Sequence, residues 1–488
     1  MRSGSHYFFP AASILILLCL LFILPAGLYA QEREKICINQ DWTFVKAETL
    51  VSEDVDWKSK EIEKISLPHT WNDQDVLDET PGYYRGVGWY RKQIKLKEGW
   101  EENQLFLEFE AANQVAEVFI DGASVGLHSG GYSGFRFDIS NFIKSGASDF
   151  ELCVRVDNSY NESIPPLTAD FTFFGGIYRD VWLIYAPETH FSLEHFGGPG
   201  VYWQTPTVNK DRAELKVSGF VSHYGDKKAK YMLEHSLQDS EGAEVGSVFY
   251  KQSFMPGKNM ELDPVTLTIE SPSLWSVDNP ITYKLVSKLL DKRSGEIIDE
   301  VHNPVGFRWF EFSADNGFFL NGEPMKIHGI SRHQDYPGMG NALDRKQHLE
   351  DIWNIKHMGA NFLRIAHYPQ DPDIVNSCDT LGLLASVEIP IVNRITESES
   401  FEKNCLSMME EMIWQNYNHP GIIMWTYMNE VLLRPPFLDD PDRLKIYFSN
   451  VEALAQKLEQ KARNLDPYRV TMIPNHGAFS KYNDHYTC

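Results

Sequence analysis

The chain has 488 residues, of which 43% are hydrophobic and 13% aromatic, so it is long enough for two to four folded domains and is not a disordered protein. Its formal net charge is −23 and no cluster of lysine or arginine stands out, which argues against a partner such as nucleic acid or an anionic membrane surface. The negative charge of the chain therefore favours a neutral substrate.

The first thirty residues have the layout of a secretory signal peptide. Arg2 precedes an apolar stretch from Ala11 to Leu24, and a small residue, Ala30, stands before the polar Gln31. The sequence therefore predicts cleavage after Ala30 and an exported protein, periplasmic or secreted, with an uncleaved anchor as the alternative. The remaining cysteines are odd in number and widely spaced, and they predict neither a disulfide framework nor a metal site. They are Cys37, Cys153, Cys378, Cys405 and Cys488.

Two β-rich segments follow the leader. Residues 31–187 contain short β runs such as WYRKQIKL, QLFLEFE and VAEVFID, separated by turn residues including an Asp-Gly pair at 121–122. Alternating apolar and polar residues with such turns predict an antiparallel β-sandwich. Residues 188–312 carry further runs, including AELKVSGFVSHYG and TYKLVSKLLD, and their length suits an immunoglobulin-like sandwich.

The pattern changes in residues 313–488, where helical segments alternate with short apolar strands. The expected strands are 325–330, 361–365, 383–387, 422–427 and 470–473, and the expected helices are 344–357, 371–381, 399–418 and 443–465. Repeated βα units predict a parallel barrel, so the fold class is multidomain: β-sandwiches followed by an incomplete (β/α)8 TIM barrel.

Polar residues stand at the carboxyl ends of four successive predicted barrel strands, the rim on which TIM barrels place their catalytic groups. These residues are His333, Arg364 with His367, Glu388, and Asn429 with Glu430. The run Gly421 to Glu430, GIIMWTYMNE, is the clearest case, because a buried strand delivers a carboxylate to its end. We therefore expect these side chains to meet in one site.

Each residue also has a structural interpretation. His333 and His367 could cap a strand or bond a carbonyl group, and Arg364 could form an ion pair with Glu388 instead of touching a substrate. Asp170, in the segment TADFTFFGGIYRD, has the surroundings of a turn residue. These alternatives stay open at the level of the sequence.

Two long segments resemble glycoside hydrolase family 2. NFLRIAHYP (361–369) looks like the first signature of that family and NYNHPGIIMWTYMNE (416–430) like the second, the acid/base signature. FFGGIYRDVWL, LWSVDNP and VGFRWFE resemble its two sandwich domains in the right order. The resemblance implies a jelly-roll-like sugar-binding sandwich at 31–187 and a retaining exo-hydrolase that acts on a glycoside or oligosaccharide. RHQDYPGMGNAL favours β-galactosidase over the alternative, β-glucuronidase.

The resemblance also implies roles for single residues. Glu430 matches the general acid/base, Asn429 the residue that hydrogen-bonds the sugar 2-hydroxyl, and the histidines at 333 and 367 match substrate-binding residues. Asp170 matches a sandwich-loop aspartate near the sugar 6-hydroxyl. Arg364 and Glu388 match the pocket floor. The chemistry requires no cofactor, and the segment 391–394, Ile-Val-Asn-Arg, lacks the family's Glu and His magnesium ligands, so a magnesium site is doubtful.

A second carboxyl group is missing from the sequence pattern. A retaining hydrolase needs a nucleophile about 5 Å from its acid, and in the family that glutamate ends the seventh strand, whereas no Glu follows Glu459 in this chain. We therefore expect a truncated family member with little activity alone. A noncatalytic carbohydrate-binding protein, a homo-oligomer, or a chain completed in trans by a C-terminal fragment are the open alternatives.

Overall fold

The computed structural model describes residues 33–433 and 435–474. The predicted signal peptide at 1–30 and Cys488 lie outside these ranges. Cys37 is exposed, whereas Cys153, Cys378 and Cys405 are buried and free. Within the described ranges, no helix is both long enough and apolar enough to cross a lipid bilayer.

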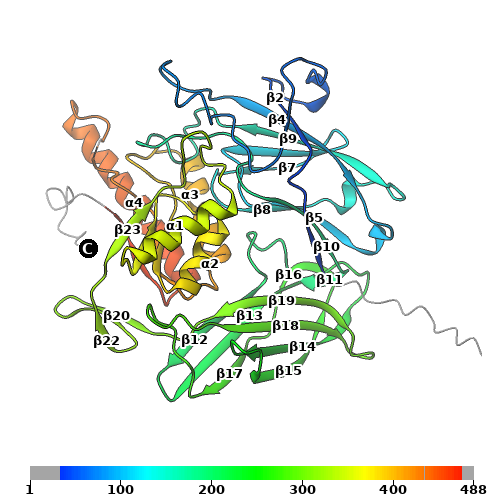
Figure 1. Cartoon of the computed structure of the whole chain (residues 1–488), viewed down its shortest axis with the longest axis vertical. Helices are drawn as coiled ribbons and strands as arrows, with labels where there is room; N and C mark the ends of the chain where they lie inside the picture. The colour runs from blue at the N-terminus through cyan, green and yellow to red at the C-terminus, as the bar shows by residue number, and fades with distance from the viewer. Residues whose placement is uncertain (1–32, 434, 475–488) are drawn as a thin grey trace, which may run out of the picture. The chain divides into compact units, whose positions relative to one another are not determined.

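Two antiparallel sheets form the first sandwich, in agreement with the alternating sequence pattern (Figure 1). One sheet has the order β1-β10-β5-β8 and the other β3-β2-β4-β9-β6-β7. Their strands are β1 (Glu34–Cys37), β2 (Trp42–Lys46), β3 (Glu63–Ile65), β4 (Val87–Lys95), β5 (Gln104–Phe109), β6 (Val115–Ile120), β7 (Ala123–Ser129), β8 (Phe135–Asp138), β9 (Asp149–Asp157) and β10 (Val181–Ala186), with single-turn 3₁₀ helices at Ser52–Asp54, Trp100–Glu102 and Ser140–Phe142. A core that includes the fully buried Trp42, Tyr90 and Phe109 fills the space between the sheets.

The second sandwich is also antiparallel. Its strand β13 pairs with β11, β12, β16 and β17, and it faces a sheet of order β15-β14-β18-β19. The strands are β11 (Thr189–Phe191), β12 (Val201–Val208), β13 (Arg212–His223), β14 (Ala229–Gln238), β15 (Glu244–Phe254), β16 (Gly257–Glu261), β17 (Val265–Glu270), β18 (Tyr283–Asp291) and β19 (Ile297–Val305). The exposed and buried positions of β17 alternate as expected for a strand with one face toward a core.

The last part of the chain contains a parallel sheet of order β23-β24-β25-β26-β27. Its strands are β23 (Gly329–Arg332), β24 (Phe362–Ile365), β25 (Leu384–Glu388), β26 (Ile422–Thr426) and β27 (Val470–Met472), preceded by the antiparallel strands β20 (Phe310–Ser313), β21 (Gly317–Leu320) and β22 (Glu323–Met325). β25 is buried at every position, which is the pattern of a parallel strand covered on both faces.

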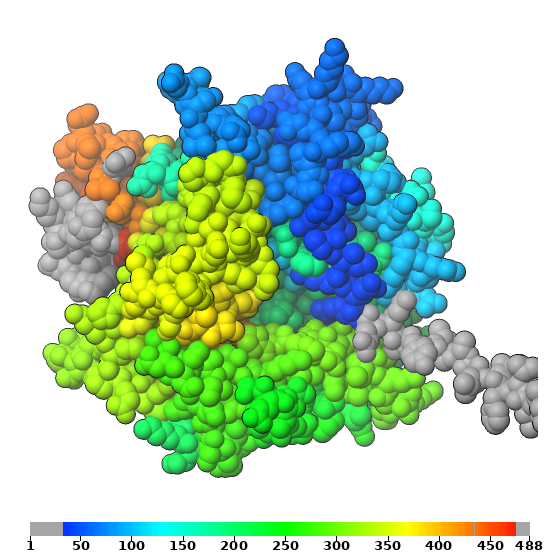
Figure 2. Space-filling model, in the orientation of Figure 1, coloured from blue at the N-terminus to red at the C-terminus, as the bar shows by residue number. Residues whose placement is uncertain are grey.

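Four helices connect these strands: α1 (Arg345–His357), α2 (Pro372–Leu381), α3 (Glu399–Gln415) and α4 (Pro441–Leu465). Their first turns are capped by the side chains of Asp344, Asp371, Ser398 and Asp440. Helices α1 and α2 (yellow) form part of the surface seen in Figure 2. Helix α2 ends at Leu381 and is capped by Gly382, whose φ of 75° and close approach to the Val277 carbonyl exclude a side chain.

Two sequence predictions need correction. The first barrel strand, expected at 325–330, lies at Gly329–Arg332, because Met325 pairs with Phe318 in the preceding antiparallel sheet. The third helix, expected to reach residue 418, ends at Gln415, because the Asn416 side chain bonds the carbonyl of Met412 and Asn418 bonds that of Val201. The domain bounds 31–187, 188–312 and 313–488 stay a prediction; the last boundary falls inside β20.

Candidate active site

The carboxyl ends of β23, β24, β25 and β26 carry the polar residues that the sequence singled out. His333 follows β23, His367 follows β24, Glu388 is the last residue of β25, and Asn429 and Glu430 follow β26. The Asn429 backbone forms a parallel bridge with Val392 beyond β25 and donates to the Ile391 carbonyl at 2.8 Å. Parallel strands therefore bring these ends to one edge of the sheet.

Arg364 is the centre of this group. Its Nη2 donates to Glu388 Oε2 at 2.9 Å and to Asn429 Oδ1 at 2.8 Å, and its Nε lies 3.2 Å from the same carboxylate oxygen. Thr426 Oγ1 lies 3.3 Å from Glu388 Oε2, and Glu388 is fully buried. Arg364 thus forms the predicted ion pair and also fixes the amide of Asn429. Contact between Arg364 and a substrate stays a prediction.

His367 joins the same network. Its Nδ1 lies 3.0 Å from Arg364 Nη2 and 3.2 Å from Glu388 Oε1, so the ring orientation is set by both members of the ion pair. The ring of His333 is 5.1 Å from that of His367 at an angle of 71°. Burial, together with the neighbouring imidazole of His367, lowers the pKa of His333, which favours a neutral ring able to both donate and accept hydrogen bonds.

A loop of the first sandwich reaches these histidines. The ring of Phe171 lies 5.4 Å from that of His333 and 6.1 Å from that of His367. Its neighbour Asp170 is exposed, and the negative charge of Asp170 raises the pKa of His333 against the larger effect of burial. The sandwich therefore supplies an aromatic wall and a carboxylate to the strand-end cluster. The sequence had marked Asp170 but not Phe171.

Glu430 has an unusual backbone conformation. Its φ is +52°, in the left-handed region that non-glycine residues seldom occupy, and its backbone N–H donates to the Pro474 carbonyl at 3.1 Å. The side chain is half-buried, and its carboxylate makes no hydrogen bond or ion pair with any residue of 33–433 or 435–474. A carboxyl group held this way is available to a ligand, and strained backbone is common at functional positions.

Arg179 was missed as a site residue, although it lies in the quoted segment FFGGIYRD. It is buried, and its Nη2 donates to the Pro369 carbonyl at 2.7 Å and lies 3.4 Å from Gln334 Oε1, while Nη1 donates to the Tyr132 carbonyl at 3.0 Å. Pro369 and Gln334 are the neighbours of the two histidine segments. Arg179 therefore connects both segments to the sandwich.

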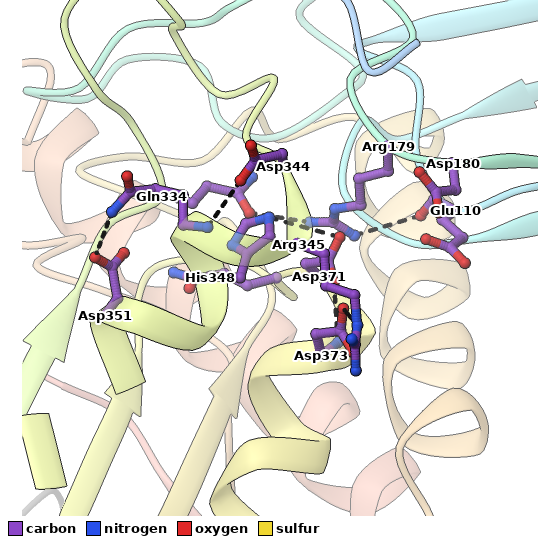
Figure 3. Close-up of polar contacts among 12 residues, drawn as sticks. Glu110, Arg179, Asp180, Gln334, Asp344, Arg345, His348, Asp351, Asp371 and Asp373 are labelled. Atoms are coloured by element: carbon purple, nitrogen blue, oxygen red, sulfur yellow. Dashed lines mark hydrogen bonds and ion pairs between the residues drawn. The ribbon is translucent and has the colours of Figure 1, made fainter. Parts of the chain in front are cut away.

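Carboxyl groups gather around this arginine. Burial, with the negative charges of Asp371 and Asp180 adding to it, raises the pKa of Glu110 to about 8 from an ordinary value of 4.5. Figure 3 shows Glu110 and Asp180 on one side of Arg179 and Asp371 on the other. Because the folded state holds the proton more tightly than the unfolded state, stability is lost as the pH rises from about 4.5 to about 8.

The substitution Glu110→Gln should remove this loss. The amide keeps an acceptor for Trp182 Nε1, which donates to Glu110 Oε1 at 2.9 Å, but cannot ionise. At pH 8.5 we expect the variant to be more stable than the parent by on the order of 2 kcal/mol, less than the full pKa shift implies because the side chain is partly exposed. Thermal unfolding at pH 5 and pH 8.5 checks this; equal pH dependence in both proteins would contradict it.

The residues of segment 391–394, where the family carries its magnesium ligands, contact other parts of the protein. Val392 pairs with Asn429, and Asn393 Nδ2 donates to the hydroxyl and the carbonyl of Thr168 at 3.3 Å each. In residues 33–433 and 435–474, no group of three or more His, Cys, Asp or Glu side chains is placed to hold a metal ion. The magnesium site stays doubtful.

Three family models match almost the whole chain. The sugar-binding domain of glycosyl hydrolases family 2 matches residues 29–187, a second model of the same family matches 200–308, and its TIM barrel domain matches 313–487. These matches follow the order of the two sandwiches and the parallel sheet.

Similar proteins carry two kinds of name. A β-glucuronidase of Bacteroides fragilis is 34% identical over 92% of this chain and 62% of its own length, and a β-galactosidase of Thermoanaerobacter pseudethanolicus is 31% identical over 88% and 55%. The crystal structure of a Bacteroides uniformis β-glucuronidase matches with a TM-score of 0.87 at 38% identity, over 92% of this chain and 53% of that one. The chain thus spans 53–62% of the length of these three relatives. It belongs to glycoside hydrolase family 2.

Proposed function

We propose that the protein is a retaining exo-hydrolase of β-glucuronidase type, with Glu430 as the general acid/base. The observation that carries this proposal is the cluster at the strand ends, in which Arg364 joins Glu388, Asn429 and His367 beside a half-buried carboxyl group that has no partner among the described residues. A glycosidase needs such a carboxyl group next to hydrogen-bonding groups that orient the sugar hydroxyls.

Each side chain then has a task in the proposed reaction. Glu430 gives its proton to the oxygen that leaves the anomeric carbon, and afterwards takes a proton from the attacking water. Asn429, held by Arg364, and the two histidines bind ring hydroxyls. The nucleophile is not assigned to any described residue. Glu388 does not suit that role, because its carboxylate is fully buried and bonded to Arg364.

The preference for a glucuronide corrects the preference for a galactoside that we took from RHQDYPGMGNAL. The relative and the solved structure with the higher identities carry the name β-glucuronidase, while the β-galactosidase is at 31%. The segment RHQDYPGMGNAL also makes contacts that stabilise the fold. Arg332 and Tyr336 both bond Asp351 of α1, and Gly340 packs on Phe174. A β-galactosidase-type activity is the second candidate.

Lactones separate the two candidates. Their planar anomeric carbon resembles the oxocarbenium-like transition state, so they bind more tightly than substrates. We expect glucaro-1,5-lactone to bind at least about 10-fold more tightly than galactono-1,5-lactone, a difference of about 1.4 kcal/mol. Calorimetric titration of the purified protein measures both affinities. The reverse order would favour the galactosidase, and absence of binding by either would count against both.

We also propose that the protein is exported, on the strength of the predicted signal peptide at 1–30, which lies outside the described residues. Fractionation of cells that express the full chain, with amino-terminal sequencing of the product, tests this. A mature protein that begins at Gln31 in the periplasm or medium supports the proposal, and an intact Met1 in the cytoplasm contradicts it.

A further inference from the structure

A hollow of about 430 Å³ lies at the opposite end of the parallel strands from the candidate active site. Its walls come from β12, from the segment that follows β19, and from the loop that precedes β27, and they include Trp203, Gln204, Arg308, Trp309 and Tyr468. The hollow therefore borders the amino ends of the parallel strands, whereas the candidate active site borders their carboxyl ends. Its volume is in the range of small-molecule sites.

Arg308 is held rigidly at this hollow. Its Nε donates to the Pro420 carbonyl at 2.6 Å and its Nη2 to the Ile422 carbonyl at 2.7 Å, so two bonds to the start of β26 fix the plane of the guanidinium. The ring of Phe310 lies 4.9 Å from the guanidinium carbon. The third nitrogen, Nη1, has no hydrogen-bond partner within residues 33–433 and 435–474. An oriented donor is thus free to bind a ligand.

Asp466, the carboxylate in the wall of the hollow, is already bonded to other groups. Asp466 Oδ2 accepts from Arg469 Nη1 at 2.7 Å and from Trp425 Nε1 at 2.9 Å. Burial and the neighbouring charge of Arg469 lower the pKa of Arg308 to about 9, which leaves the guanidinium charged at pH 7. The hollow therefore contains a positive charge to which no carboxylate of residues 33–433 or 435–474 is bonded, in a chain whose net charge is −23.

The other walls suit a ring with hydroxyl groups. Trp309 is half-buried and Tyr468 is 48% exposed, so both present aromatic surface. Gln204 is oriented by the hydroxyl of Tyr417, which accepts from Gln204 Nε2 at 2.7 Å and leaves the amide oxygen as an acceptor. Aromatic surface with a few fixed polar groups is the usual composition of a small-molecule site.

We propose that this hollow is a second binding site, for a hexuronate or a similar hydroxylated ring that bears one carboxylate. The carboxylate binds Arg308 Nη1 by a charge-assisted hydrogen bond, and the ring packs on Trp309 and Tyr468. The proposal does not depend on the hydrolytic function, because none of these residues belongs to the strand-end cluster.

Titration of the full-length protein with D-glucuronate and with D-glucose tests the proposal. In the variant His367→Ala, which weakens the candidate active site, one glucuronate-binding event should remain. Adding Trp309→Ala or Tyr468→Ala should weaken that event at least about 10-fold, as should 0.5 M salt, and D-glucose should not bind. Arg308→Gln should act in the same direction, but it also removes bonds to β26, so the aromatic variants are decisive.

Tyr160→Ala is the matched control, because Tyr160 is 55% exposed on the first sandwich. It should leave glucuronate binding unchanged. Loss of all glucuronate binding in His367→Ala, or binding that Trp309→Ala and Tyr468→Ala leave unchanged, would overturn the second site. Failure of the proposed hydrolytic function looks different: His367→Ala would then have no effect on any binding event, while the aromatic variants would still weaken one.

Discussion

Phenol release from an aryl β-glucuronide should fall by about 10²- to 10⁴-fold when Glu430 is replaced by glutamine, the usual contribution of a general acid or base. The assay includes azide as an external nucleophile, so the rate does not depend on which residue supplies the second carboxyl group. Azide attacks the anomeric carbon, the bond to the phenolic oxygen breaks, and the proton of Glu430 passes to that oxygen. Glutamine has no proton to give.

The acidity of the leaving phenol provides an internal check. A phenolate that is already stable needs little protonation, so the loss in Glu430→Gln should be small for an acidic phenol and large for a weakly acidic one. Glu350→Gln is the matched control, since Glu350 is exposed on α1. If Glu430→Gln and Glu350→Gln release a weakly acidic phenol at equal rates, Glu430 is not the acid.

Replacing Arg364 with methionine should destabilise the protein by about 3–5 kcal/mol, because it leaves the fully buried carboxylate of Glu388 without its cation. The variant should also lose lactone binding, since Asn429 and His367 lose the group that orients them. Denaturant unfolding measures the first effect and calorimetric titration the second.

The double variant Arg364→Met with Glu388→Leu separates stability from binding. Exchanging both members of a buried ion pair for apolar side chains is often close to neutral for stability. We therefore expect most of the lost stability to return while lactone binding stays absent. Binding that returns together with stability would show that Arg364 serves the fold alone.

Much of the candidate site could be predicted from the sequence because strand ends are local features. An apolar run that stops at a polar residue, as Ile422 to Thr426 stops before Asn429 and Glu430, marks both the strand and the residue at its end. The helices expected from residues 344, 371 and 399 begin at Arg345, Pro372 and Glu399, each directly after a side chain that caps the first turn. Parallel pairing then places the carboxyl ends of separate strands at one edge of the sheet, so the grouping of their side chains needs no further information.

The residues that the sequence did not predict act over long distances in the chain. Phe171 lies against His367, and Arg179 bonds Pro369, a residue 190 positions away. Nothing in the neighbours of Arg179 distinguishes a clamp between two domains from a surface arginine. The first barrel strand was misplaced because an apolar residue such as Met325 fits a barrel strand and the preceding antiparallel strand equally well. Only its pairing with Phe318 decides between the two.

The most direct test of the strand-end site is a crystal structure of the protein with glucaro-1,5-lactone. The account predicts the lactone at the carboxyl ends of β23 to β26, with its anomeric carbon beside the Glu430 carboxyl group and a ring hydroxyl on Asn429. A lactone bound elsewhere, with Glu430 turned away from His333 and His367, would contradict it.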